Sequence, residues 1–413
     1  MAFPPMHFSR RSLLKGAVVG AAGTALTGGG ILGAADPADA EAAPTGVGSY
    51  PFHGTHQAGI LTPAPAQKQS AACFAAFDLT AASKGEVAEL LQTITTRSRF
   101  LATGGGPPEP AFDQPPPDSD VLGPVIPADG LTVTVALGSS FFDGRFGLAD
   151  KKPRHLTPMR VFPDDSPVPA WLHGDLLLQL CANHPDTVHH AIRDVAKHTR
   201  GAMQPRWKIE GYAAPPRPSG TARNLLGFKD GTANPVGDLA ARLVWVNDPS
   251  EPAWAQGGSY QVVRLIRMLV EFWDRVSLTE QEGMFGRRKD SGAPLDGNSE
   301  FDTPNYAADP EGEVIPLTAH IRLSNPRTPA TADQRLLRRS YNYDLGLDAN
   351  GNIQAGHVFV CFQQDVHRQF ETVQTRLIGE PLIDYVQPFG GGYFFVAPGV
   401  VDTHDWYGRR LFL

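Results

Sequence analysis

Along residues 72–213, segments with the apolar pattern of strands alternate with segments that have the apolar spacing of helices. Short apolar runs typical of strands occupy 72–79, 131–137, 175–181 and 206–213. Helical spacing follows the capping box of Ser83 and Glu86, and it resumes after Pro185. The resulting order, β-α-β-β-α-β, is the split βαβ arrangement of ferredoxin-like domains.

The same order recurs after a Pro-rich segment at 214–220, which we interpret as a linker. Strands are expected at 259–270, 335–343, 357–363 and 392–396. Helical spacing is expected in a helix capped by Ser277 and Glu280, and in one carrying Val366, Phe370, Val373 and Leu377. The sequence therefore predicts an α+β chain of two ferredoxin-like domains with antiparallel sheets, at 41–213 and 221–413.

Residues 1–40 have the composition of an export signal. The stretch Ser9-Arg10-Arg11-Ser12-Leu13-Leu14-Lys15 is typical of a twin-arginine signal, and Ala38-Asp39-Ala40 offers a cleavage site. The alternative is a chance arginine pair before a tail. We expect export through the twin-arginine translocase to the periplasm, cell envelope or extracellular space, with no stable membrane span after cleavage. Because this route carries folded proteins, it also favours a bound cofactor.

Composition excludes several other classes of protein. The formal net charge is −7, and the sequence has no long basic run outside its N-terminus, so nucleic acid is not an expected partner. The three cysteines, Cys73, Cys181 and Cys361, have no metal-site spacing and are expected to be buried thiols. The sequence allows a homodimer without requiring one.

A compact loop motif, Gly227-Phe228-Lys229-Asp230-Gly231-Thr232-Ala233-Asn234-Pro235, carries the first candidate for chemistry. Its glycines allow a ligand to approach the backbone, and Asn-Pro ends any regular element. Asp230 is therefore either an acid/base group beside a ligand or a turn-forming residue whose carboxylate satisfies loop amides.

Two further segments carry candidates. His320 lies in an otherwise apolar stretch, where it is either a core histidine or an axial ligand to a haem iron. Arg338 and Arg339 lie in a predicted strand, where successive side chains point to opposite faces. One of them can face a pocket, and the other is expected to meet solvent or an interface; the alternative is two solvated arginines.

Taken together, these segments resemble the dye-decolourising peroxidases, a family of haem peroxidases built from two ferredoxin-like domains. The resemblance extends from Gln57 to the C-terminus. It rests on the segments Gly227–Pro235, Ala319-His320-Ile321-Arg322, Leu337-Arg338-Arg339, Gly258-Ser259-Tyr260, Phe272-Trp273-Asp274, Phe285-Gly286-Arg287-Arg288-Lys289 and Gly390-Gly391-Gly392-Tyr393-Phe394-Phe395. The export signal further resembles the subgroup that includes deferrochelatases.

The resemblance implies one haem b per chain, bound in the C-terminal half. His320 would be the proximal iron ligand, Asp230 the distal acid/base, and Arg338 the distal cation. The residues implied to line the haem are Gly231, Thr232, Ala233, Asn325, Pro326, Arg327 and Arg338. Asp365 is either the hydrogen-bond partner of the His320 Nδ1–H or the start of the last helix.

The implied function is that of an exported peroxidase. It would use hydrogen peroxide to oxidise dyes and other organic electron donors by one-electron steps through a ferryl intermediate. The alternatives are a deferrochelatase, which releases iron from haem with the porphyrin intact, and a non-catalytic haem or iron carrier. A carboxylate base favours activity highest at about pH 4–5. For dyes that cannot reach the haem, surface aromatics are candidate electron relays: Trp273, Tyr341, Tyr343, Tyr393, Trp406 and Tyr407.

Overall fold

The computed structural model describes residues 48–107 and 113–413, so the export signal expected at 1–40 lies outside the described residues. The strands are β1 (Ala71–Leu79), β2 (Thr132–Gly138), β3 (Leu176–Ala182), β4 (Met203–Tyr212), β5 (Ser259–Met268), β6 (Leu337–Arg338), β7 (Tyr341–Leu347), β8 (Ile353–Gln363) and β9 (Val386–Val396). The α-helices are α1 (Lys84–Thr103), α2 (Pro185–His198), α3 (Gly237–Val244), α4 (Val270–Trp273), α5 (Leu278–Phe285), α6 (His320–Ser324) and α7 (Thr372–Arg376).

These strands form one sheet that closes on itself. The strand order is β5-β9-β2-β3-β1-β4-β7-β8-β6, and β5 pairs with β8 as well as with β9. Every pairing between these strands is antiparallel. The N-terminal strands β1–β4 meet the C-terminal strands at two seams, β2 with β9 and β4 with β7. The architecture is thus a mixture of helices and an antiparallel, barrel-like sheet.

Alternate residues of the strands pack into two different cores. In β1, Cys73 and Phe77 belong to the larger cluster with α1 and α2, whereas Phe74 belongs to a second cluster with residues of β7 and β8. This follows from the two-residue period of a strand, and it explains why the sequence of β1 is almost continuously apolar. The three cysteines are buried free thiols, as expected.

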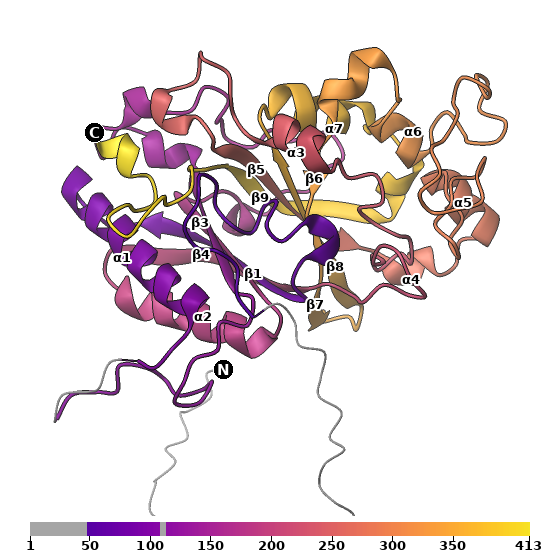
Figure 1. Ribbon diagram of the computed structural model, residues 1–413. Helices are drawn as coiled ribbons and strands as arrows, with labels where there is room; N and C mark the ends of the chain where they lie inside the picture. The colour runs from indigo at the N-terminus through magenta and orange to yellow at the C-terminus, as the bar shows by residue number, and fades with distance from the viewer. Residues whose placement is uncertain (1–47, 108–112) are drawn as a thin grey trace, which may run out of the picture. The chain divides into compact units, whose positions relative to one another are not determined.

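Helix α1 begins as the sequence predicts. The Ser83 hydroxyl accepts the backbone N–H of Glu86 at 3.2 Å, and the Glu86 carboxylate accepts the N–H of Ala82 at 2.8 Å. The buried face of α1 carries Val87, Leu90, Leu91 and Ile94. Together with α2, this helix covers one face of the N-terminal strands (Figure 1).

Three expected elements differ from the sequence prediction. The strand expected at 335–343 is divided into β6 and β7, because the Ser340 hydroxyl accepts the N–H of Val360 at 3.2 Å in place of a backbone carbonyl. The helix expected to carry Val366 to Leu377 is a π-helical turn, His367–Glu371, followed by α7. The last strand begins at Val386 rather than at residue 392.

Within residues 48–107 and 113–413, no helix is both long and apolar enough to cross a membrane. The same residues contain no group of three or more His, Cys, Asp or Glu side chains arranged to hold a metal ion.

Candidate active site

Hydrogen bonds hold the Asp230 loop before and after Asp230. The Asp230 N–H donates to the carbonyl of Ala222 at 3.0 Å, and the Asn234 N–H donates to the carbonyl of Gly231 at 3.0 Å. Beneath the loop, Glu300 accepts from Lys229 at 2.6 Å and from the Thr232 hydroxyl at 3.1 Å. The loop is therefore a fixed platform for the Asp230 side chain.

Arg338 reaches this loop because of its register in the sheet. Arg338 lies opposite Cys361, and Asn342 opposite His357, so their side chains share one face. The Asn234 amide donates to the Arg338 carbonyl at 2.7 Å and accepts the Arg338 N–H at 3.0 Å. Asn234 thus joins the loop to the strand that carries Arg338.

Arg339 lies on the opposite face, as the strand period predicts, but it does not meet solvent. Its guanidinium is buried and donates to the carbonyl of Pro63 at 2.6 Å and to the Gln69 side chain at 2.8 Å. The expectation of a solvent position was wrong, because the sheet is closed and both of its faces are covered; the guanidinium instead meets Pro63 and Gln69 of the N-terminal half.

Asp230 lies between Arg338 and His357. Its Oδ1 lies 3.2 Å from Nη1 of Arg338, and its Oδ2 lies 3.0 Å from Nε2 of His357. Burial acts to raise the pKa of the Asp230 carboxyl, but Arg338, His357 and Lys68 outweigh burial, so its pKa lies well below the ordinary value. Burial in turn lowers the pKa of Lys68 to about 8. Asp230 is consequently an ionised carboxylate with 22% of its side chain accessible.

His320 is held through one ring nitrogen. Its Nδ1 lies 2.8 Å from Oε2 of Glu380, so a neutral ring donates Nδ1–H to the carboxylate and leaves Nε2 as the lone-pair nitrogen. Among the residues that the structure describes, none hydrogen-bonds to Nε2. Burial acts to lower the pKa of His320, but Glu380 outweighs it and the net pKa is raised; the charges of Arg338 and Asp230 also act on this ring.

Asp365 is not the partner of His320. Its carboxylate accepts the N–H groups of His367 at 2.9 Å and Arg368 at 3.1 Å, which places it at the start of the π-helical turn. Of the two roles that the sequence left open, the helix start is the one that the structure supports, and Glu380 takes the other.

The other residues predicted to line the haem differ in their contacts and in their exposure to solvent. Gly231 has φ +100°, and a Cβ at this position would meet nothing closer than the Asn234 amide at 3.7 Å, so the backbone borders open space. The carbonyl of Ala233 accepts from Arg335 at 3.1 Å. After α6, Asn325 and Pro326 are half-buried and Arg327 is exposed. Burial lowers the pKa of Arg335, and the charge of Arg327 lowers it further.

These features fit a haem. His320 offers an unpartnered imidazole nitrogen, which is the usual proximal donor to haem iron. Arg338 and Asp230 are partly accessible, and their charges act on His320. Arginines such as Arg327 and Arg335 suit the carboxylates of a porphyrin. The donor set therefore matches the group that the motifs suggest.

Sequence reasoning missed three residues of this site. Glu380 lies 60 residues beyond His320, and no local pattern links the two. His357 is a polar residue in an apolar strand, and this pattern could have marked it as a candidate. Its contact with Asp230, however, depends on the strand register. Asn234 was read as a turn residue, whereas its side chain is the clamp on Arg338.

The aromatics proposed as surface relays are mostly interior. Five of them are buried: Trp273, Tyr341, Tyr343, Tyr393 and Tyr407. Trp406 is half-buried, so of the six it is the one with appreciable access to solvent. An apolar strand or core position accounts for the other five.

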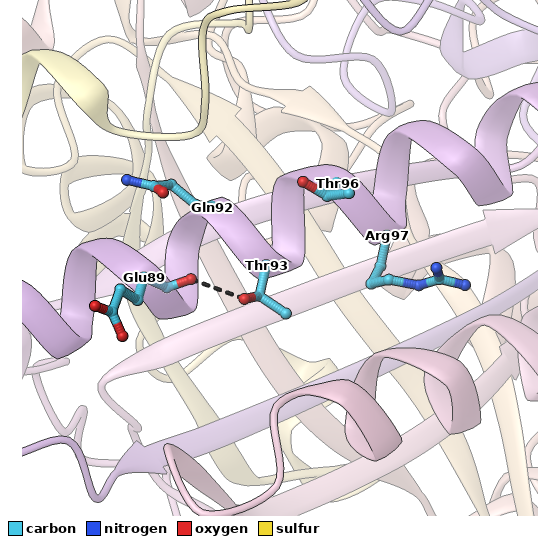
Figure 2. A pocket seen from close by; sticks show the side chains of 5 residues that line it. All are labelled: Glu89, Gln92, Thr93, Thr96 and Arg97. Atoms are coloured by element: carbon cyan, nitrogen blue, oxygen red, sulfur yellow. Dashed lines mark hydrogen bonds between the residues drawn. The ribbon is translucent and has the colours of Figure 1, made fainter. Parts of the chain in front are cut away.

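A shallow surface depression on α1 lies apart from these residues (Figure 2). It is lined by Glu89, Gln92, Thr93, Thr96 and Arg97. The Thr93 hydroxyl donates to the carbonyl of Glu89 at 2.9 Å, as the dashed line in Figure 2 marks, and Arg97 pairs with Asp194 at 2.7 Å. Thr93 and Arg97 thus have local partners, and the depression includes none of the candidate residues.

Comparisons with known proteins agree with this geometry. The family profiles "Dyp-type peroxidase, N-terminal" and "Dyp-type peroxidase, C-terminal" match residues 57–213 and 221–401. The deferrochelatase of Shigella flexneri serotype 5b (strain 8401) is 48% identical over 421 residues, covering 98% of this chain and 96% of that protein.

Solved structures show the same relationship. A DyP-type peroxidase from Cellulomonas bogoriensis has a TM-score of 0.79 at 35% identity, covering 90% of this chain and 99% of that one. Ferric DtpA from Streptomyces lividans has a TM-score of 0.78 at 36% identity, covering 89% and 97%. The chain therefore belongs to the Dyp-type peroxidase family, whose members are haem-dependent enzymes, and this confirms the resemblance that its motifs suggested.

Proposed function

We propose that the chain binds one haem b through Nε2 of His320 and reduces hydrogen peroxide at Asp230 and Arg338 while oxidising organic donors. The observation that carries this proposal is the ion pair of Asp230 and Arg338 at 3.2 Å, within electrostatic reach of His320. A haem carrier needs the ligand but neither an acid/base nor a distal cation, so this pair favours the enzyme.

The residues divide the chemistry between them. His320 would hold the haem through Nε2, and the haem iron would supply the two electrons that reduce peroxide. Asp230 accepts the proton of the peroxide oxygen nearer the iron and returns it to the leaving oxygen, a role typically worth about 10²–10⁴-fold. Arg338 stabilises the negative charge that develops as the O–O bond breaks. Glu380 holds the His320 ring and increases its basicity.

An absorption spectrum of the purified protein, before and after one equivalent of peroxide, tests the proposal. We expect a Soret band that changes with peroxide in the native chain and that is lost or greatly weakened in His320→Ala. His367→Gln is the matched control, because His367 is an exposed histidine paired with Glu371 at 3.0 Å. Full haem retention and activity in His320→Ala would show that the ligand assignment is wrong.

Deferrochelatase activity is the second candidate, and the name of the Shigella flexneri relative favours it. The two activities leave different products. Incubation with haem and peroxide should leave the donor oxidised and the porphyrin metallated if the chain is a peroxidase. Iron-free porphyrin, detected by its fluorescence, would instead support release of iron.

We also propose export by the twin-arginine route, supported by Arg10 and Arg11 and the small-residue site at Ala38–Ala40. Fractionation of cells expressing Arg10→Lys with Arg11→Lys should leave the chain in the cytoplasm. The division into two ferredoxin-like domains is supported by the neighbour order β4-β1-β3-β2, which is followed in the C-terminal strands by β9-β5-β8-β7.

A further inference from the structure

His357 is a buried histidine in direct contact with the distal carboxylate. Its Nε2 lies 3.0 Å from Oδ2 of Asp230, and its Nδ1 lies 3.4 Å from Oδ1 of Asn342. The ring side chain is 10% accessible, so water does not compete freely for either nitrogen.

The hydrogen-bond partners of Asn342 determine which ring nitrogen carries a proton. The Asn342 Nδ2 lies 3.1 Å from the carbonyl of Arg223, which can only accept, so Nδ2 is the NH₂ group and Oδ1 faces His357. Nδ1 of His357 must therefore be the N–H that donates to Asn342. In a neutral ring, Nε2 would then be unprotonated and would face Asp230 without a hydrogen.

Nε2 of His357 and Oδ2 of Asp230 lie 3.0 Å apart, so one of the two atoms must carry a proton that it donates to the other. Either His357 is an imidazolium beside a carboxylate, or Asp230 is a carboxylic acid that donates to a neutral ring. Arg338, 3.2 Å from the other carboxylate oxygen, favours the ionised carboxylate. Lys68 acts in the same direction. The geometry and the surrounding charge thus assign the proton to His357.

We propose that His357 acts on the reaction through the distal acid/base: as an imidazolium, it holds Asp230 ionised. The inference rests on the proposed role of Asp230 in the reaction with peroxide. With Arg338 on Oδ1 and His357 on Oδ2, each oxygen is held by one donor, and the remaining lone pairs are left for the peroxide proton.

This arrangement has a consequence for pH. The groups that act on Asp230 besides burial are Arg338 on β6, His357 on β8 and Lys68 before β1. Removing His357 removes one cation and one hydrogen bond from the carboxylate, so Asp230 becomes easier to protonate. The loss of activity should then be confined to low pH, since Asp230 is ionised at neutral pH with or without His357.

The experiment compares wild type, His357→Gln and the control His367→Gln as haem-loaded full-length proteins. Stopped-flow absorption gives the rate constant for the reaction with peroxide as a function of pH. In His357→Gln, we expect the acid limb to move up by about one to two pH units, with the rate at pH 7 within about threefold of wild type. An unmoved acid limb, or a loss uniform across pH, would overturn the proposal.

Infrared difference spectroscopy of the same proteins, labelled with ¹³C-aspartate, follows Asp230 without reference to activity. The Asp230 band is the one missing from Asp230→Asn. We expect a carboxylate in wild type at pH 7 and a carboxylic acid that appears at higher pH in His357→Gln than in wild type. A carboxylic acid in wild type at pH 7 would overturn the proposal even if His357→Gln did not fold. Full peroxide reactivity of Asp230→Asn would instead refute the proposed function and leave the infrared result standing.

Discussion

The clamp between Asn234 and Arg338 gives the sharpest test of how the site is built. Strand β6 is two residues long, and Arg338 is its last residue. The Asn234 amide supplies two hydrogen bonds, at 2.7 Å and 3.0 Å, to the backbone of Arg338. Asn234→Ala removes both and leaves the guanidinium on a less constrained strand.

The magnitude follows from the two bonds. Each contributes about 1 kcal/mol to the free energy of unfolding, so Asn234→Ala should lose about 2 kcal/mol. For a domain of this size, that corresponds to about 2–3 °C in Tm. The reaction with peroxide should slow by about tenfold or more, because a small displacement of a charge-stabilising group is costly.

Differential scanning calorimetry and stopped-flow absorption of the haem-loaded protein measure these two effects. Asn350→Ala is the matched control, because Asn350 lies in an exposed turn between β7 and β8. We expect the control to match wild type in both assays. If Asn234→Ala kept its Tm within about 0.5 °C and its rate within about twofold, the clamp would not position Arg338.

Three further outcomes are expected. Asp230→Asn should slow the reaction with peroxide by about 10²–10⁴-fold at unchanged haem content, which stopped-flow absorption measures; a normal rate would exclude Asp230 as the acid/base. Glu380→Gln should weaken haem retention by about 10–100-fold in transfer to apomyoglobin, whereas Asp365→Asn should not; equal effects would contradict the assignment of Glu380 as the partner of His320. Because the pKa of Asp230 is lowered in the folded protein, the stability it contributes is present above its unfolded pKa of about 3.9 and is lost as pH falls through the lowered value. The acid limb of the peroxide reaction should therefore lie below about pH 4, and a limb near pH 6 would contradict this.

Much of the fold could be predicted because its signals are local. The capping box of Ser83 and Glu86, and the apolar face of α1, depend on residues within a few positions of one another. The break between β6 and β7 could not be predicted, since it depends on Ser340 bonding to Val360, which lies on another strand. Closure of the sheet likewise depends on the pairing of β5 with both β8 and β9, which no single segment encodes.

In the candidate site, too, some residues could be predicted from the sequence and others could not. Asp230, His320 and Arg338 lie in segments with distinct composition, and each could be singled out along the chain. Their partners could not, because the contact of His320 with Glu380 and that of Asp230 with His357 join segments 60 and 127 residues apart. Such pairs are specified by strand register and loop packing rather than by spacing.

The closed sheet has a consequence for how the enzyme can be divided. The seam between β2 and β9 consists of three residue pairs, and the seam between β4 and β7 of one. Arg339 adds a tie across the halves by donating to Pro63 and Gln69. Separating the halves at the linker would expose the edges of β2, β9, β4 and β7. It would also leave the buried guanidinium of Arg339 without its two acceptors. The candidate site, although its residues lie in the C-terminal half, is therefore expected to form in the intact chain and not in an excised C-terminal fragment.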